Sequence, residues 1–274
     1  MKTYITLLLT LLSASVILAQ NPQTETLTVP LSKPGQEYSL KVKNFLGQIK
    51  ITGYEGKDIQ ISVTPEEADN NDDGRRPAEA QGMKKISTDR GYELTAKEAD
   101  NNVTVNTNNF EKVVNLELKI PQNVRLEAGT VNEGVVTIEN ISGDIEVNNI
   151  NDDIKLTGIS GSVVANTVNG DVRVSFKSIK PETPMAFSTL NGDVNVEFPA
   201  DLKARVKIKS DHGDVYSDFD IEIDKTPAKT EKVSQPGLYQ IKKDDWIYGK
   251  INGGGPEMMF KNMTGDIYIK KVAK

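Results

Sequence analysis

Cysteine is absent from the 274 residues of this sequence, and histidine occurs once, at His212. The absence of cysteine excludes a disulfide framework, thiolate zinc sites and a cysteine nucleophile. A single histidine excludes metal sites built from several histidines, and it limits a Ser-His-Asp triad to one possible base. Aromatic residues make up only 6% of the chain, with one tryptophan, so aliphatic side chains have to form most of the core.

Acidic residues outnumber basic ones, and the formal net charge is −6. A nucleic-acid-binding protein needs a basic face that displaces counterions from phosphate groups. The charge balance therefore argues against nucleic acid as a partner. Nothing in the sequence calls for a cofactor, and we expect none.

The first residues follow the order of a secretory signal peptide, with Lys2, a leucine-rich run and small residues up to Ala19. We therefore predict that residues 1–19 are removed and that the protein is exported, to the periplasm, the outer surface or the medium. No later segment approaches the run of about 18 apolar residues that a membrane-spanning helix requires. The sequence thus predicts no transmembrane segment in the mature chain.

A nine-residue repeat organises the chain from Gly134 onward. The third and fifth places of a unit share one face of a strand, because side chains alternate with period two. The odd step from the fifth to the eighth place returns a side chain to the interior only if the chain turns a corner. We therefore expect corners between strands and all three apolar places in the core: Val136, Ile138 and Ile141; Ile145, Val147 and Ile150; Ile154, Leu156 and Ile159; Val163, Ala165 and Val168.

The ninth place of successive units alternates between serine and asparagine, which doubles the period to 18 residues. This predicts an all-β fold, a β-solenoid whose coils have roughly 18–22 residues and stack about 4.8 Å apart. Later Gly-Asp pairs follow at longer spacings, at Gly192 and Gly213, and Gly265-Asp266 begins a last unit. An antiparallel meander, sandwich or barrel is the alternative, because Asn169-Gly170 and Asn191-Gly192 are also hairpin-turn signals.

The chain divides by composition into a signal peptide, a strand-rich N-terminal β region and the repeat region. No linker rich in Gly, Ser and Pro separates the last two, so we expect one continuous body. A polar loop interrupts the N-terminal region, and a polar insertion leaves the solenoid and returns at Trp246. The expected boundaries are 1–19 for the signal peptide, 20–125 for the N-terminal region with loop 65–82, and 126–274 for the solenoid with insertion 224–245.

Several strings in the chain carry a family resemblance: NTVNGDVRVSF at 166–176, PMAFSTLNGDVNVEFPADLKARVKIKSDHGDVYSDFDI at 184–221 and a closing MTGDIYIKK. With the upstream ELKIPQNVRLEAGTVNEG and GYEGKDIQISV segments, they resemble the bacterial putative-adhesin domains of unknown function, which are related to the head domains of auto-transporter-like adhesins. The resemblance implies an exported, right-handed β-helix-like solenoid without an established enzymatic activity. The signal peptide, ending in LAQ, is similar to those of Bacteroidetes proteins.

Two groups of acidic residues are candidates for calcium. The first is a column of aspartates at the corners, for which the alternative is that each one caps a backbone N–H in a turn. The second is a loop that begins like an EF-hand, with Asp69, Asn71 and Asp73, but has Ala80 where the bidentate glutamate belongs. We favour turn capping and a solvated acidic loop over metal binding. The column comprises Asp144, Asp153, Asp171, Asp193, Asp214 and Asp266.

The outward fourth places of the repeat supply the candidates for ligand binding and catalysis. On an 18-residue coil Thr137, Lys155 and Arg173 line one side, whereas Glu146 and Val164 line the other. This predicts a small basic strip, with Lys155 and Arg173 as ligand contacts, rather than the paired carboxylates of a glycoside hydrolase. We therefore expect no catalytic residues. A β-helix enzyme acting on polysaccharide, a lyase or hydrolase, is the alternative.

Four aromatic residues gather near the C-terminal end of the sequence: Trp246, Tyr248, Phe260 and Tyr268. They could form a platform for sugar or partner binding, with Trp246 and Tyr248 as contacts, or cap the open end of the solenoid. His212 lies where the sister turns have asparagine, and we expect it to fill that turn position. The sequence as a whole predicts a non-enzymatic adhesin or cell-envelope scaffold, with a glycan or an envelope or surface protein as partner.

Overall fold

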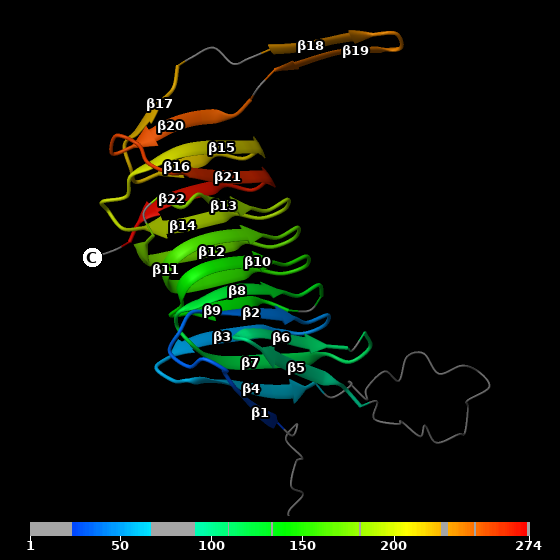
Figure 1. Ribbon diagram of the computed structural model, residues 1–274. Helices are drawn as coiled ribbons and strands as arrows, with labels where there is room; N and C mark the ends of the chain where they lie inside the picture. The colour runs from blue at the N-terminus through cyan, green and yellow to red at the C-terminus, as the bar shows by residue number, and fades with distance from the viewer. Residues whose placement is uncertain are drawn as a thin grey trace, which may run out of the picture.

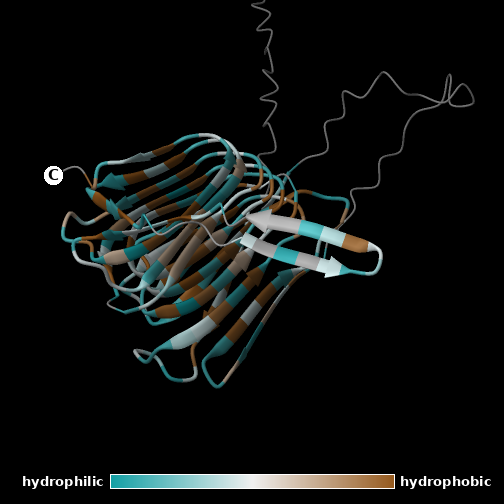
Figure 2. Cartoon of the chain, turned by 90° about the horizontal axis from the view of Figure 1, so that it is seen from above, coloured by the Kyte–Doolittle hydropathy of each residue, from teal (hydrophilic) through white to brown (hydrophobic). Residues whose placement is uncertain are grey.

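The computed structural model describes residues 24–66, 91–108, 110–132, 134–180, 182–225, 230–243 and 245–272. These residues form a β-solenoid in which two layers of strands face each other and stack into a column (Figure 1). Seen down the column, apolar and polar residues alternate along the strands (Figure 2). Within the described residues no helix has the length and apolar character needed to cross a membrane.

Layer A is one of the two stacks of strands. Its pairings are antiparallel among the first three strands and parallel in the rest. In spatial order it contains β1 (Glu25–Pro30), β4 (Asp58–Pro65), β7 (Val114–Pro121), β3 (Ile49–Tyr54), β9 (Val136–Glu139), the first part of β11 (Ile154–Asn166), β12 (Val172–Ile179), β14 (Val194–Phe198), β22 (Ile267–Lys271) and β16 (Val215–Ser217).

Layer B is the opposite stack, and β11 passes into it after Gly158, whose φ of 68° makes the bend. Its inner pairings are parallel, with antiparallel pairs at both ends. In spatial order it contains β5 (Leu94–Ala99), β6 (Asn102–Thr107), β2 (Tyr38–Lys43), β8 (Val124–Gly129), β10 (Ser142–Asn148), the second part of β11, β13 (Met185–Ser188), β21 (Glu257–Thr264), β15 (Ala204–His212), β20 (Ile247–Ile251) and β17 (Ile221–Ile223).

The register of the parallel ladders confirms the predicted coil length. Ser142 lies beside Ser160, and Ile154 beside Val172, so these coils have 18 residues. Val172 lies beside Val194, which makes the next coil 22 residues long. Because neighbouring strands of the repeat are parallel, the antiparallel meander is wrong for this region.

The coils do not all stack in the order of the sequence. The coil β21–β22 lies between β13–β14 and β15–β16, so the unit at Gly213 does not follow the unit at Gly192 as the repeat suggests. At the other end the coil β2–β3 lies between β6–β7 and β8–β9. Each parallel strand has two equivalent edges, and similar coils fit either one. A repeat pattern therefore cannot tell sequential stacking from insertion.

The third and fifth places of the repeat point into the core, as predicted, with Val136, Ile138, Ile154 and Leu156 at most 1% exposed. Toward the C-terminal coils the aliphatic columns give way to phenylalanine. These rings stack or meet edge to face at centroid distances of 5.1 to 6.3 Å, in the range where aromatic pairs attract. The buried rings are Phe176, Phe187, Phe198 and Phe260.

The eighth place of the repeat behaves differently at the two corners of a coil. Where the chain passes from layer A to layer B, Ile141 and Ile159 are buried, as predicted. Where it returns from layer B to layer A, Ile150 and Val168 are exposed, so the prediction that they enter the core is wrong. The reason is that the preceding residue, in the seventh place, turns inward instead.

That seventh-place residue is polar and buried because it serves the corner backbone. The Asn149 amide donates to the carbonyl of Gly134 at 3.0 Å, and the Thr167 hydroxyl donates to the carbonyl of Asp152 at 3.0 Å. A buried carbonyl without a partner destabilises the fold, so these bonds fix the corner. The same buried position in other coils holds Asn44, Thr130, Thr189 and Asn262.

The polar segment 224–245 contains a separate two-stranded hairpin. Its strands are β18 (Thr230–Gln235) and β19 (Leu238–Lys243), which pair with each other alone. They project from the end of the column that β17 and β20 form (Figure 1). Residues 1–19, most of loop 65–82 and the EF-hand-like residues Asp69, Asn71 and Asp73 lie outside the described residues.

Candidate functional site

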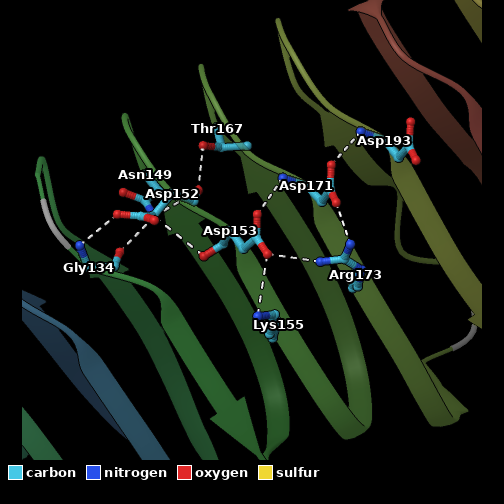
Figure 3. A network of polar contacts seen from close by, with 9 residues as sticks. All are labelled: Gly134, Asn149, Asp152, Asp153, Lys155, Thr167, Asp171, Arg173 and Asp193. Carbon is cyan, nitrogen blue, oxygen red and sulfur yellow. Dashed lines mark hydrogen bonds and ion pairs between the residues drawn. The ribbon is translucent and has the colours of Figure 1, made fainter.

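The corner aspartates of layer A form a hydrogen-bonded ladder (Figure 3). Asp153 Oδ1 accepts the backbone N–H of Asp171 at 2.9 Å, and Asp171 Oδ1 accepts that of Asp193 at 2.7 Å. The ladder continues in the same way: Asp193 Oδ1 accepts the backbone N–H of Asp266 at 2.8 Å, and Asp266 Oδ1 accepts that of Asp214 at 2.9 Å. One oxygen of each accepting carboxylate thus binds a backbone N–H at the corner of the neighbouring coil. This agrees with the interpretation that these aspartates cap backbone N–H groups.

Asp144 does not belong to this ladder, although the alignment of the nine-residue units places it in the same column. It lies in layer B, where its Oδ1 accepts the hydroxyl of Ser162 at 2.7 Å and its Oδ2 lies 3.5 Å from the Lys180 ammonium. The Ser162 hydroxyl, followed by the charge of Lys180, holds the pKa of Asp144 below its usual value despite partial burial. The nine-residue repeat does not separate the two layers, which explains the error.

The predicted strip of Thr137, Lys155 and Arg173 lies in register on adjacent strands of layer A. It is not basic, because the aspartate ladder neutralises it. Arg173 donates to Asp153 at 2.9 Å and also to Asp171, and the Lys155 ammonium lies 3.4 Å from Asp153 (Figure 3). The surface has paired charges held in fixed positions.

The electrostatics of Asp153 follow from these contacts. Partial burial raises the pKa of its carboxyl group, but the Asp171 N–H and the Lys155 and Arg173 cations outweigh that effect. The net result is a pKa below the usual value for aspartate. The carboxylate is therefore charged at neutral pH and keeps both cations in place.

Glu146 and Val164 lie in register with each other on layer B, away from Lys155 and Arg173 on layer A. Glu146 accepts a hydrogen bond from the Asn148 amide at 3.1 Å. The acidic and basic candidates of the enzyme alternative therefore do not share a surface. In the part of the chain that the structure describes, no group of three or more His, Asp or Glu residues could hold a metal ion.

The four C-terminal aromatic residues do not cluster. Phe260 is buried and stacks on Phe187 at 5.3 Å. Trp246 lies under the Lys207 ammonium at 4.5 Å, just before β20, and Tyr248 is on β20 itself. Tyr268 is on layer A. The insertion of β21–β22 into the stack separates Phe260 and Tyr268 from Trp246 and Tyr248, so the prediction that all four form one platform or one end cap is wrong.

Tyr268 instead forms an aromatic pair that the sequence did not indicate. Its ring stacks on Tyr216 with a centroid distance of 5.3 Å and an interplanar angle of 13°. The Tyr268 hydroxyl donates to Asp266 at 3.0 Å, which raises the pKa of the phenol above its usual value. The signal was the aromatic residue two places after the Gly-Asp pair in both units.

This pair completes a straight row on the outer face of layer A, with one side chain from each successive strand. We call it the layer A row. It presents an ammonium, a guanidinium, an amide and two phenol groups at the strand spacing of about 4.8 Å. Its members are Lys155, Arg173, Asn195, Tyr268 and Tyr216.

A second surface lies at the corner where layer B returns to layer A. One apolar side chain from each of six stacked coils lies there, and we call this set the corner ridge. The ridge residues Ile150, Val168, Leu190 and Met263 are 38 to 43% exposed. For four of its members the sequence signal was the asparagine that follows them, whereas Met263 precedes a threonine and Phe45 a leucine. The ridge comprises Phe45, Val131, Ile150, Val168, Leu190 and Met263.

Comparison with known proteins gives one family match. The family model described as Toastrack DUF4097 matches residues 121–270. No curated protein matches the chain.

Two solved structures are similar to the chain. A putative cell adhesion protein from Clostridium sporogenes has 13% identity and a TM-score of 0.46, covering 92% of this chain and 100% of that one. A putative adhesin from Bacteroides fragilis has 12% identity and a TM-score of 0.31, covering 92% and 99%.

Proposed function

The chain belongs to the Toastrack DUF4097 family, and on that premise we propose that it is an exported, non-enzymatic, adhesin-like binding module of the cell envelope. The observation that carries the proposal is the layer A row. Its side chains project from a rigid parallel sheet and include several hydrogen-bond donors beside an aromatic pair. The resemblance to the head domains of auto-transporter-like adhesins is part of this proposal.

The layer A row supports binding because its members are held before a ligand arrives. Arg173 is fixed by Asp153 and Asp171, and Tyr216 and Tyr268 are fixed by each other and by their aspartates. A surface that is already ordered loses little side-chain entropy on binding. Phenol, amide and guanidinium groups suit a glycan or a polar protein surface, and we propose such a partner.

Binding and turnover together test this function. The purified protein is applied to an array of neutral and anionic glycans and to envelope fractions, and released products are measured in parallel. We expect retention without cleavage, and at least tenfold weaker retention for the double variant Tyr216→Ala, Tyr268→Ala.

Tyr239→Ala is the matched control, because Tyr239 is an exposed tyrosine on the separate hairpin. Unchanged retention of the double variant overturns the layer A row as the contact. Cleavage of any glycan that is lost with Glu146→Gln or Arg173→Lys overturns the non-enzymatic assignment.

A further inference from the structure

The corner ridge is an unusual surface because four consecutive coils of the stack expose an apolar residue there, and the next two coils each add a half-buried one. Single exposed apolar residues are ordinary, whereas a contiguous array marks an interaction surface. The corner does not need these side chains for folding, since the buried residue before each of them holds the turn. Thr189, for example, donates to the carbonyl of Gly170 at 2.8 Å, which leaves Leu190 outside.

The ridge has a fixed repeat that restricts what can cover it. Its side chains come from neighbouring parallel strands, so they recur about every 4.8 Å. Side chains on one face of an extended peptide recur at roughly 6.6 to 6.8 Å, and successive helical turns at about 5.4 Å. Only another stack of parallel strands matches the ridge along its whole length. A second copy of this chain has that repeat.

We infer that the corner ridge packs against the corner ridge of a second copy. Uncharged polar side chains flank the central coils of the ridge, although the chain as a whole is acidic. On one side lies a ladder of neutral amides, in which Asn169 donates to Asn151 at 2.9 Å and Asn191 donates to Asn169 at 2.8 Å. On the other side the central coils present Asn148, Asn166 and Ser188, and the two end coils present Lys43 and Lys261.

The two ends of the ridge differ, which indicates how the copies are oriented. At one end Phe45 meets Phe110 edge to face at 4.6 Å, and an apolar groove runs from these rings to Ile150. The floor of the groove is Gly129, where a side chain would meet the backbone of Asn148. At the other end the ridge stops at exposed Asp211, in line with Met263.

A two-fold axis across the middle of the ridge brings these unlike ends together. Ile150 of one copy then faces Val168 of the other, and Leu190 lies over the groove at Gly129. The contact is isologous, so the groove is filled twice. The ridge spans five strand spacings, about 24 Å, which places the contact in the small, weakly associating class. We therefore expect a dimer that dissociates on dilution.

Sedimentation velocity over a concentration series tests this dimer with the purified protein. We expect the wild type to shift from monomer to dimer as its concentration rises, and the double variant Val168→Asp, Leu190→Asp to associate at least tenfold more weakly. Leu27→Asp is the matched control, because Leu27 is 41% exposed and lies on β1, away from the ridge. Unchanged circular dichroism of each variant establishes that it folds.

Cysteine cross-linking gives a second measurement, because the natural chain has no cysteine of its own. A mixture of the single variants Ile150→Cys and Val168→Cys should form a mixed disulfide. The control is Glu146→Cys, at an exposed site on layer B, and the mixed disulfide should form at least tenfold faster than the disulfide between two copies of this control. These substitutions are at the corner and leave the layer A row intact. A failure to dimerise can therefore be distinguished from a failure to bind glycans.

Three results overturn the inference. The first is a wild type that stays monomeric at every concentration. The second is a cross-linking rate for the ridge pair equal to that of Glu146→Cys. The third is a monomeric wild type whose binding to lipid vesicles or glycans is lost with Val168→Asp, Leu190→Asp, because the ridge then serves another occupant.

Discussion

Each coil of this solenoid turns twice, and the two corners bury different kinds of side chain, apolar at one and polar at the other. At the corner from layer A to layer B, Ile141 and Ile159 are buried. At the corner from layer B to layer A, Asn149 and Thr167 are buried and the neighbouring aliphatic residue is outside. The first corner is held by apolar packing, and the second by hydrogen bonds to its own backbone.

The difference shows how a repeat can reserve one edge for contact with other molecules. A corner that needs an aliphatic residue inside cannot also present it to a partner. A corner that is fixed by a buried amide or hydroxyl leaves the next position free to vary. Four mutational tests, in order of decreasing expected effect, separate these two kinds of corner.

Ile159→Ala removes the side chain that packs inside the apolar corner. We expect a loss of about 2 to 5 kcal/mol in the free energy of unfolding, because the deleted methyl groups leave a cavity in a site that is 0% exposed. Urea unfolding followed by circular dichroism measures it. A loss below about 0.5 kcal/mol would show that this corner is not held by packing.

Asn149→Ala removes the amide inside the polar corner. Two carbonyl groups, of Gly134 and Asp152, lose a donor at 3.0 Å, and we expect a loss of about 1 to 3 kcal/mol in the free energy of unfolding. Asn148→Ala is the control, because its side chain is exposed one residue earlier. Equal losses in the two variants would contradict a specific role for the buried amide.

Acid should weaken the polar corner through Asp153, which follows it. The pKa of Asp153 is lower in the folded chain than in the unfolded one, so its contribution to stability is present above the unfolded value, about 3.9, and is lost as the pH falls through the folded value. Asp153→Asn should therefore lose less stability than the wild type as the pH falls through the unfolded value and below it.

Urea midpoints at a series of pH values measure this difference. Asp201→Asn, at an exposed position outside the ladder, serves as the control. If the pH dependence of stability in Asp153→Asn is as steep as in the wild type, the aspartate ladder does not stabilise this corner.

Val168→Ala is the counterpart of Ile159→Ala at the polar corner. Its side chain is on the corner ridge, so we expect a change within about 0.5 kcal/mol in the free energy of unfolding at a concentration where the protein is monomeric. Thermal unfolding of dilute protein measures it. A loss comparable to that of Ile159→Ala would mean that the ridge residues support the fold.

The repeat was enough to predict the strands and the coil length. The third and fifth places of a unit obey strand alternation, which is a local rule, and Val136 and Ile138 are buried as that rule requires. The eighth place could not be predicted in the same way. Its direction depends on whether the residue before it has backbone groups to bind, and that depends on the neighbouring coil.

The candidate site was predicted only in part. Lys155 and Arg173 lie side by side because the 18-residue period fixes their register. The pairing of Lys155 with Asp153 follows from strand alternation, because the two residues are two places apart in one coil. The pairing of Arg173 with Asp153 could not be anticipated, because it crosses between coils and between places of the repeat. Tyr216 and Tyr268 are 52 positions apart and meet only because β22 lies beside β16, which no local pattern encodes.

The insertion of β21–β22 also has a consequence for how the chain acquires its structure. A solenoid whose coils stack in sequence order can grow from one end, with each coil docking on the last. Here β15 and β16 have no parallel partner until residues 257–271 arrive between them and β13–β14. During synthesis this part of the column therefore has unpaired strand edges in its interior until residues 257–271 emerge. Completion of the column then becomes a single late event that joins segments far apart in the chain.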